Sequence, residues 1–115
     1  MSYGVYSEVY LAIDMDYWKK EENIMVKVGE STNSRRRSKQ LERDKYITVV
    51  SDYEIGGTEV YRKWVEGCLR LYIEKTFDCY QVGTDTFVFR KKQEVKEIQM
   101  LFTTLVTQII NTKMF

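Results

Sequence analysis

The chain has 115 residues, of which 43% are hydrophobic and 30% are charged, and its net charge is +1. This balance predicts a single globular domain over residues 1–115 and argues against long disorder. There is no histidine, and there are only two cysteines, Cys68 and Cys79. The composition therefore excludes histidine-based triads, histidine general bases, histidine zinc sites and a disulfide scaffold.

Two further features bear on where the protein acts. No apolar run approaches the roughly 18 residues of a membrane-spanning helix, and Met1 leads into polar residues rather than a secretory signal. We therefore expect a cytoplasmic protein with no membrane partner. Residues 27–45 hold seven bases against three acids, which indicates either a phosphate-facing patch or a solvated helix face.

The first half of the chain predicts two strands and a helix. Apolar residues alternate over Glu8 to Asp14 and again over Ile24 to Glu30, which favours an antiparallel hairpin. A helix follows to about Asp44, with Leu41 as its clear apolar anchor. Arg37 precedes Leu41 by four residues and so shares its face. We therefore expect Arg37 to point at the sheet.

The second half predicts a strand over Tyr46 to Ile55 and a helix that Thr58 caps and that runs to about Phe77. Glu66 lies on the flank of the apolar stripe of this helix, and we expect Gly67 to reflect close packing. The stripe comprises Tyr61, Trp64, Val65, Cys68, Leu69 and Tyr72. A hairpin-like segment follows over Tyr80 to Phe89.

The last helix begins near Lys91 and carries an apolar seam formed by Val95, Ile98, Phe102, Leu105 and Ile109. Packing on the sheet is one interpretation of this seam, and a homodimer interface is the other. Antiparallel strands with separate helices predict an α+β fold.

Five short motifs, in order, resemble the GIY-YIG nucleases, in the branch of phages and mobile elements whose second motif reads Lys-Ile-Gly. The motifs are Val9-Tyr10-Leu11, Lys27-Val28-Gly29, Arg37 to Leu41, Glu66 to Arg70, and Asp85-Thr86-Phe87. The resemblance covers residues 5–90. It implies a small three-stranded antiparallel sheet flanked by helices, to which residues 91–115 add a C-terminal helix.

The resemblance also implies a metal-dependent endonuclease that hydrolyses DNA phosphodiester bonds. Glu66 would hold a single Mg²⁺ or Mn²⁺ ion, and Arg37 would neutralise charge on the phosphate. Tyr10 would act as the base or position the attacking water, and Lys27 would assist. Four further basic side chains would contact phosphates along the DNA backbone: Arg35, Arg36, Lys39 and Arg43.

The motifs also depart from the family pattern. Tyr10 has no adjoining glycine, so Tyr6 in Gly4-Val5-Tyr6 is an alternative first-motif tyrosine, and Lys27 replaces the second tyrosine. A second hypothesis is therefore an inactive protein of phage or mobile-element origin. It would bind and inhibit a host defence protein through exposed aromatics such as Tyr17 and Trp18, or bind nucleic acid without cutting it.

Overall fold

The computed structural model describes residues 8–54 and 58–112. Its elements confirm the expected α+β class. In chain order they are β1 (Glu8–Asp14), the 3₁₀ helix η1 (Met15–Trp18), β2 (Ile24–Ser31), α1 (Ser34–Arg43), β3 (Tyr46–Glu54), α2 (Glu59–Thr76), β4 (Cys79–Gln81), β5 (Thr86–Phe89) and α3 (Lys92–Asn111).

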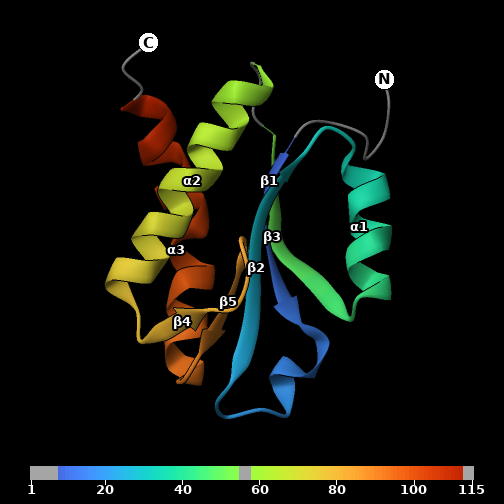
Figure 1. The fold of residues 1–115 in the computed structure, drawn as a ribbon, viewed down its shortest axis with the longest axis vertical. Helices are drawn as coiled ribbons and strands as arrows, with labels where there is room; N and C mark the ends of the chain where they lie inside the picture. The colour runs from blue at the N-terminus through green and yellow to red at the C-terminus, as the bar shows by residue number, and fades with distance from the viewer. Residues whose placement is uncertain (1–7, 55–57, 113–115) are drawn as a thin grey trace.

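The sheet has five antiparallel strands in the order β3-β1-β2-β5-β4, and it separates α1 on one face from α2 and α3 on the other (Figure 1). The expected three-stranded sheet, β3-β1-β2, is therefore extended by two strands. The hairpin predicted over residues 80–89 supplies them, because β5 pairs with the first half of β2. Phe87 and Phe89 are fully buried there, so the pairing completes the core.

The alternation in β1 divides its side chains between two cores. Val9, Leu11 and Ile13 are fully buried in the large core, which the sheet forms with α2 and α3. Tyr10 and Ala12 face the other way and pack with other residues in a small core under α1. Those residues are Leu41 and, partly buried, Tyr46. Leu41 therefore anchors α1 to the sheet, as its position in the helix predicted.

Helix α2 begins as expected, because the Thr58 side chain accepts a hydrogen bond from the Tyr61 N–H at 3.2 Å. Its buried stripe is rotated from the predicted one and is formed by Arg62, Val65, Leu69 and Ile73. The expectation of close packing at Gly67 was wrong, because a Cβ placed there would meet nothing within 4 Å. Gly67 thus costs the helix about 1 kcal/mol relative to alanine with no packing contact in return.

Helix α3 packs on the sheet and on α2 inside the protein. The seam is buried at Val95, Ile98, Phe102 and Leu105, and Ile109 is partly buried against the same core. This is one of the two arrangements expected for the seam, and a homodimer through α3 stays a prediction. Within the described residues, neither α3 nor any other helix is long and apolar enough to cross a membrane.

Candidate active site

The candidate site lies where β2 extends beyond β5. The two strands pair from Ile24 to Lys27, and the Val28 N–H then donates to the Asp85 carbonyl at 3.0 Å. Gly29 to Ser31 continue past this point, still paired with β1. Around this part of β2, Arg37 of α1 lies over the ring of Tyr10 of β1. The charges of Glu66 on α2 and of Asp85 in the β4–β5 turn act on Tyr10 as well, and Glu66 is paired with Arg70.

Tyr10 lies directly across the ladder from Gly29, and its ring covers that glycine. A Cβ on Gly29 would stand 2.4 Å from the Tyr10 hydroxyl oxygen and 2.5 Å from Cζ. Only a residue without a side chain permits this approach. The glycine of the second motif therefore has a physical role, since it lets the tyrosine of the first motif cross β2.

Replacing Gly29 by alanine is expected to destabilise the protein by about 1–3 kcal/mol, because the new methyl group must displace the buried Tyr10 ring. Thermal unfolding followed by circular dichroism measures the change. Gly83→Ala is the matched control, because a Cβ there would meet nothing within 4 Å. Equal unfolding temperatures for Gly29→Ala and the wild type would show that Tyr10 does not occupy the space above Gly29.

Arg37 reaches Tyr10 from α1. The Asn33 side chain caps this helix by accepting the Arg36 N–H at 3.0 Å, and Leu41 turns the face that carries Arg37 toward the sheet. The Arg37 guanidinium carbon lies 5.9 Å from the centroid of the Tyr10 ring. Its Nη1 also donates to the Gln40 side-chain oxygen at 3.1 Å. The expectation that Arg37 points at the sheet is therefore confirmed.

Glu66 reaches the same region from α2. Its largely buried carboxylate lies 3.6 Å from Nε of Arg70, one turn later in the helix. Burial raises the pKa of Glu66, the positive charges of Arg70 and Lys63 oppose the rise, and the negative charges of Glu30 and Asp85 add to it. Glu66 thus stands between cations and acids, with Arg70 as its ion-pair partner and Glu30 and Asp85 close enough to act on its charge.

The position of α2 is held by a second, more buried ion pair. Nε of Arg62 lies 3.3 Å from the Glu30 carboxylate, and both side chains are largely buried. Arg62 stands one turn before Glu66, and Glu30 directly follows Gly29. The pair therefore ties the turn of α2 that carries Glu66 to the part of β2 that Tyr10 crosses. Sequence reasoning missed this contact, because nothing local in the chain links residue 30 to residue 62.

The environment of Tyr10 decides its protonation. Burial raises the pKa of Tyr10 to about 12, and the charges of Asp85, Glu66 and Glu8 add to the rise, while Arg37 opposes it. The positive charge of Arg37 is therefore outweighed. At neutral pH the hydroxyl keeps its proton, so Tyr10 is suited to orient a water molecule rather than to remove a proton from one.

Asp85 is the functional candidate to which the sequence assigned no role. It stands in the turn before β5, where the Thr86 hydroxyl donates to its Oδ1 at 3.1 Å. Its charge raises the pKa values of Tyr10 and Glu66, so it belongs to the same cluster. The motif Asp85-Thr86-Phe87 was the available signal, since it places an acid just before a buried strand.

Lys27 lies on the same face of β2 as Gly29, two residues earlier in the strand. Its ammonium lies over the Tyr46 ring, 5.6 Å from the ring centroid. The alternative first-motif tyrosine, Tyr6, lies outside the described residues. Of the two aromatics expected at a contact surface, Trp18 is 70% exposed, whereas Tyr17 is buried.

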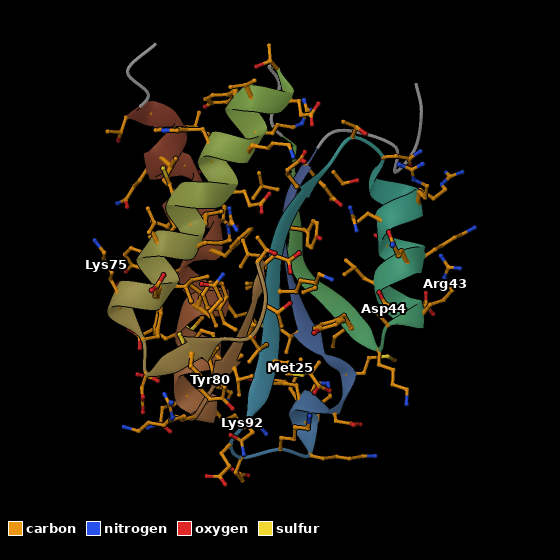
Figure 2. The ribbon with its side chains drawn as sticks, in the orientation of Figure 1. Met25, Arg43, Asp44, Lys75, Tyr80 and Lys92 are labelled. Atoms are coloured by element: carbon orange, nitrogen blue, oxygen red, sulfur yellow. The ribbon has the colours of Figure 1, made fainter. Side chains whose placement is uncertain are left out.

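The basic residues of α1 other than Arg37 are exposed to solvent. Arg36, Lys39 and Arg43, together with Glu42, line an open groove of about 700 Å³, and Arg35 is exposed near the start of the helix. Figure 2 shows Arg43 on the side of α1 that faces away from the sheet. The exposed arginines thus form a surface separate from Arg37, which turns inward.

Burial is the main cause of the raised pKa of Glu66, and the charges of Glu30 and Asp85 add to it; a divalent cation bound at Glu66 would favour the ionised carboxylate. Within residues 8–54 and 58–112, no group of three or more acidic, cysteine or histidine side chains could hold a metal by itself. A cation here would therefore share its ligands with water and substrate. In comparisons with known proteins, no family model, curated protein or solved structure matches this chain.

Proposed function

We propose that this protein is a metal-dependent endonuclease of the GIY-YIG type, which hydrolyses phosphodiester bonds in DNA. One observation carries the proposal: Tyr10 lies across Gly29, the Arg37 guanidinium lies over the Tyr10 ring, and the charge of Glu66 acts on Tyr10 from a third element. These are the residues that the family resemblance selects from β1, α1 and α2.

The chemistry assigns one role to each group. Glu66 would hold Mg²⁺ or Mn²⁺, which when bound would polarise the phosphate and stabilise the leaving oxygen. Arg37 neutralises charge that develops on the phosphate. The protonated Tyr10 hydroxyl orients the attacking water, and Asp85 is the nearby carboxylate suited to accept its proton. Lys27, on the same face as Tyr10, adds positive charge for the substrate.

DNA would approach along the exposed face of α1. Arg35, Arg36, Lys39 and Arg43 would contact backbone phosphates, which position a duplex without reading its sequence. Arg37 lies on the same helix with its guanidinium turned toward Tyr10.

The test is nicking of supercoiled plasmid by the purified protein, with Mg²⁺, with Mn²⁺ and with a chelator. We expect open-circular product with either metal and none with the chelator. Folded protein that cuts nothing with either metal would contradict the proposal. Protein that cuts equally well in the chelator would contradict the role of the metal.

The dependence of nicking on pH follows from the two shifted pKa values. We expect the rate to fall in acid as Glu66 takes up a proton, at a pH above the ordinary pKa of glutamate because burial raises it. We expect no gain near pH 10, because the pKa of Tyr10 is about 12. Tyr10→Phe should lower the nicking rate at every pH and leave the fall of the rate in acid unchanged. An alkaline gain near pH 10 that Tyr10→Phe removes would contradict this reading.

Two observations favour the second hypothesis, a protein with the same fold that does not cut. Tyr10 is only 2% exposed, and Glu66 already faces the guanidinium of Arg70. Such a protein would bind a host defence protein, with Trp18 as an exposed aromatic contact, or bind DNA without hydrolysis. DNA binding that is lost at high salt, with no nicking under either metal, would support the DNA-binding form.

A further inference from the structure

The two arginine–glutamate pairs that Arg62 and Arg70 of α2 form differ in how closely they are made. Arg62 donates a hydrogen bond to Glu30 at 3.3 Å, and both side chains are largely buried. Nε of Arg70 lies 3.6 Å from the Glu66 carboxylate, which is too far for a hydrogen bond. This Nε is buried and donates to no acceptor in the described part of the chain. The Arg70–Glu66 pair is therefore an attraction between charges rather than a hydrogen-bonded contact.

Arg70 is anchored by another group. Its Nη1 donates to the Thr84 carbonyl, in the β4–β5 turn, at 2.6 Å. The Gln81 side-chain amide donates to the same oxygen at 2.8 Å. The guanidinium thus keeps its place without Glu66, and the Thr84 carbonyl keeps a donor without Arg70. The pair can therefore open without loss of the turn that leads to Asp85.

Glu66 needs a positive charge beside it when it is ionised. Burial raises the pKa of Glu66, Arg70 opposes the rise, and Glu30 and Asp85 add to it. Lys63 also lowers the pKa of Glu66, but it does so less than Arg70, and its side chain is exposed. Arg70 is therefore the main source of the positive charge that a bound divalent cation would supply instead.

We infer that Arg70 is the resident counter-charge of Glu66 and competes with the divalent cation for this carboxylate; this inference rests on the proposed metal-dependent function. Arg70 neutralises Glu66 while no cation is bound, and it repels a cation that approaches the same carboxylate. Since charges interact more strongly where side chains are shielded from water, removing the guanidinium charge should tighten cation binding at Glu66. Loss of a residue that merely supported the fold would have the opposite effect, because it would loosen the site.

The test measures Mn²⁺ binding at Glu66 in the absence of DNA, so that no cutting enters the readout. Mn²⁺ is added stepwise to isotope-labelled protein, and paramagnetic broadening of the NMR amide signals of Glu66 and its neighbours gives the affinity. We expect Arg70→Met to reach half-broadening at about tenfold less Mn²⁺ than the wild type. Arg70→Gln, a second neutral variant, should do the same. Arg70→Lys should stay near the wild type, because it keeps the charge.

Lys75→Met is the matched control, because it removes the same charge from an exposed position about two and a half turns after Glu66 in α2. Figure 2 shows Lys75 on the side of α2 that faces away from the sheet, and this variant should bind Mn²⁺ like the wild type. Adding Glu66→Gln to Arg70→Met should abolish the tighter binding. Binding that stayed tight would place the cation elsewhere and overturn the inference.

Neutral Arg70 variants that bind Mn²⁺ no more tightly than the wild type, or that do not fold, would also overturn it. So would an Arg70→Lys variant that binds as tightly as Arg70→Met, since the charge would then not be the cause. Plasmid nicking, scored separately, tests the function. A nicking wild type with unchanged Mn²⁺ binding in Arg70→Met overturns the inference alone. Tighter binding in Arg70→Met, lost again with Glu66→Gln, in a protein that never nicks supports the inference and contradicts the endonuclease.

Discussion

Replacing Glu66 by glutamine is expected to slow metal-dependent nicking by about a thousandfold. The amide keeps the size of the side chain but removes the negative charge that would hold the cation. Loss of a metal ion that stabilises the transition state costs several kcal/mol, and about 4 kcal/mol corresponds to a factor of about 10³ in rate. Single-turnover nicking of supercoiled plasmid in Mg²⁺ measures the effect.

The variant should stay folded, because burial raises the pKa of Glu66 and so disfavours its ionised form. Ionised Glu66 is therefore less favourable in the folded protein than a neutral group of the same shape. Glu97→Gln is the matched control, since Glu97 is an exposed glutamate on α3, and it should nick like the wild type. A folded Glu66→Gln protein that nicks at the wild-type rate would remove Glu66 from the site.

Replacing Arg37 by alanine is expected to slow nicking by about 10²–10³-fold at saturating DNA, the usual loss when one preorganised donor to a transition state is removed. Affinity for DNA should change much less, because the guanidinium is turned toward Tyr10 rather than outward. Arg37→Lys should restore only part of the rate, because an ammonium cannot make the paired hydrogen bonds of a guanidinium.

Arg36→Ala provides the contrast. Arg36 lines the groove on the outer face of α1, so its loss should weaken binding and reduce the salt dependence by about one phosphate contact. The rate at saturating DNA should be unchanged. If both arginine variants lowered affinity equally and left the rate unchanged, Arg37 would be one more backbone contact and not part of the reaction site.

Local pattern was enough to predict most of the fold. Strands β1 and β2 and helix α2 lie within one or two residues of their predicted bounds, because alternation and capping are properties of neighbouring residues. The extension of the sheet was different, since it depends on Phe87 and Phe89 pairing with β2 about 60 residues earlier. Register between distant strands is set by tertiary packing, which no local pattern contains.

The candidate site shows the same difference between what local sequence pattern predicts and what tertiary packing decides. Helical spacing placed Arg37 on the face of Leu41, and the structure brings it over Tyr10. The raised pKa of Tyr10 was not foreseeable, because it comes from burial and from acids on other elements. The expected exposure of Tyr17 failed for a similar reason, since that ring packs into the large core while the neighbouring Trp18 faces solvent.

The most direct measurement is the nicking rate of four proteins on one plasmid preparation: the wild type, Glu66→Gln, Arg37→Ala and the double variant. Residues that act as one catalytic unit are strongly non-additive. If Tyr10, Arg37 and Glu66 form one working site, the double variant will be about as slow as the slower single variant. Losses that multiply in the double variant, or a wild type that does not nick at all, would contradict a single site beside Gly29.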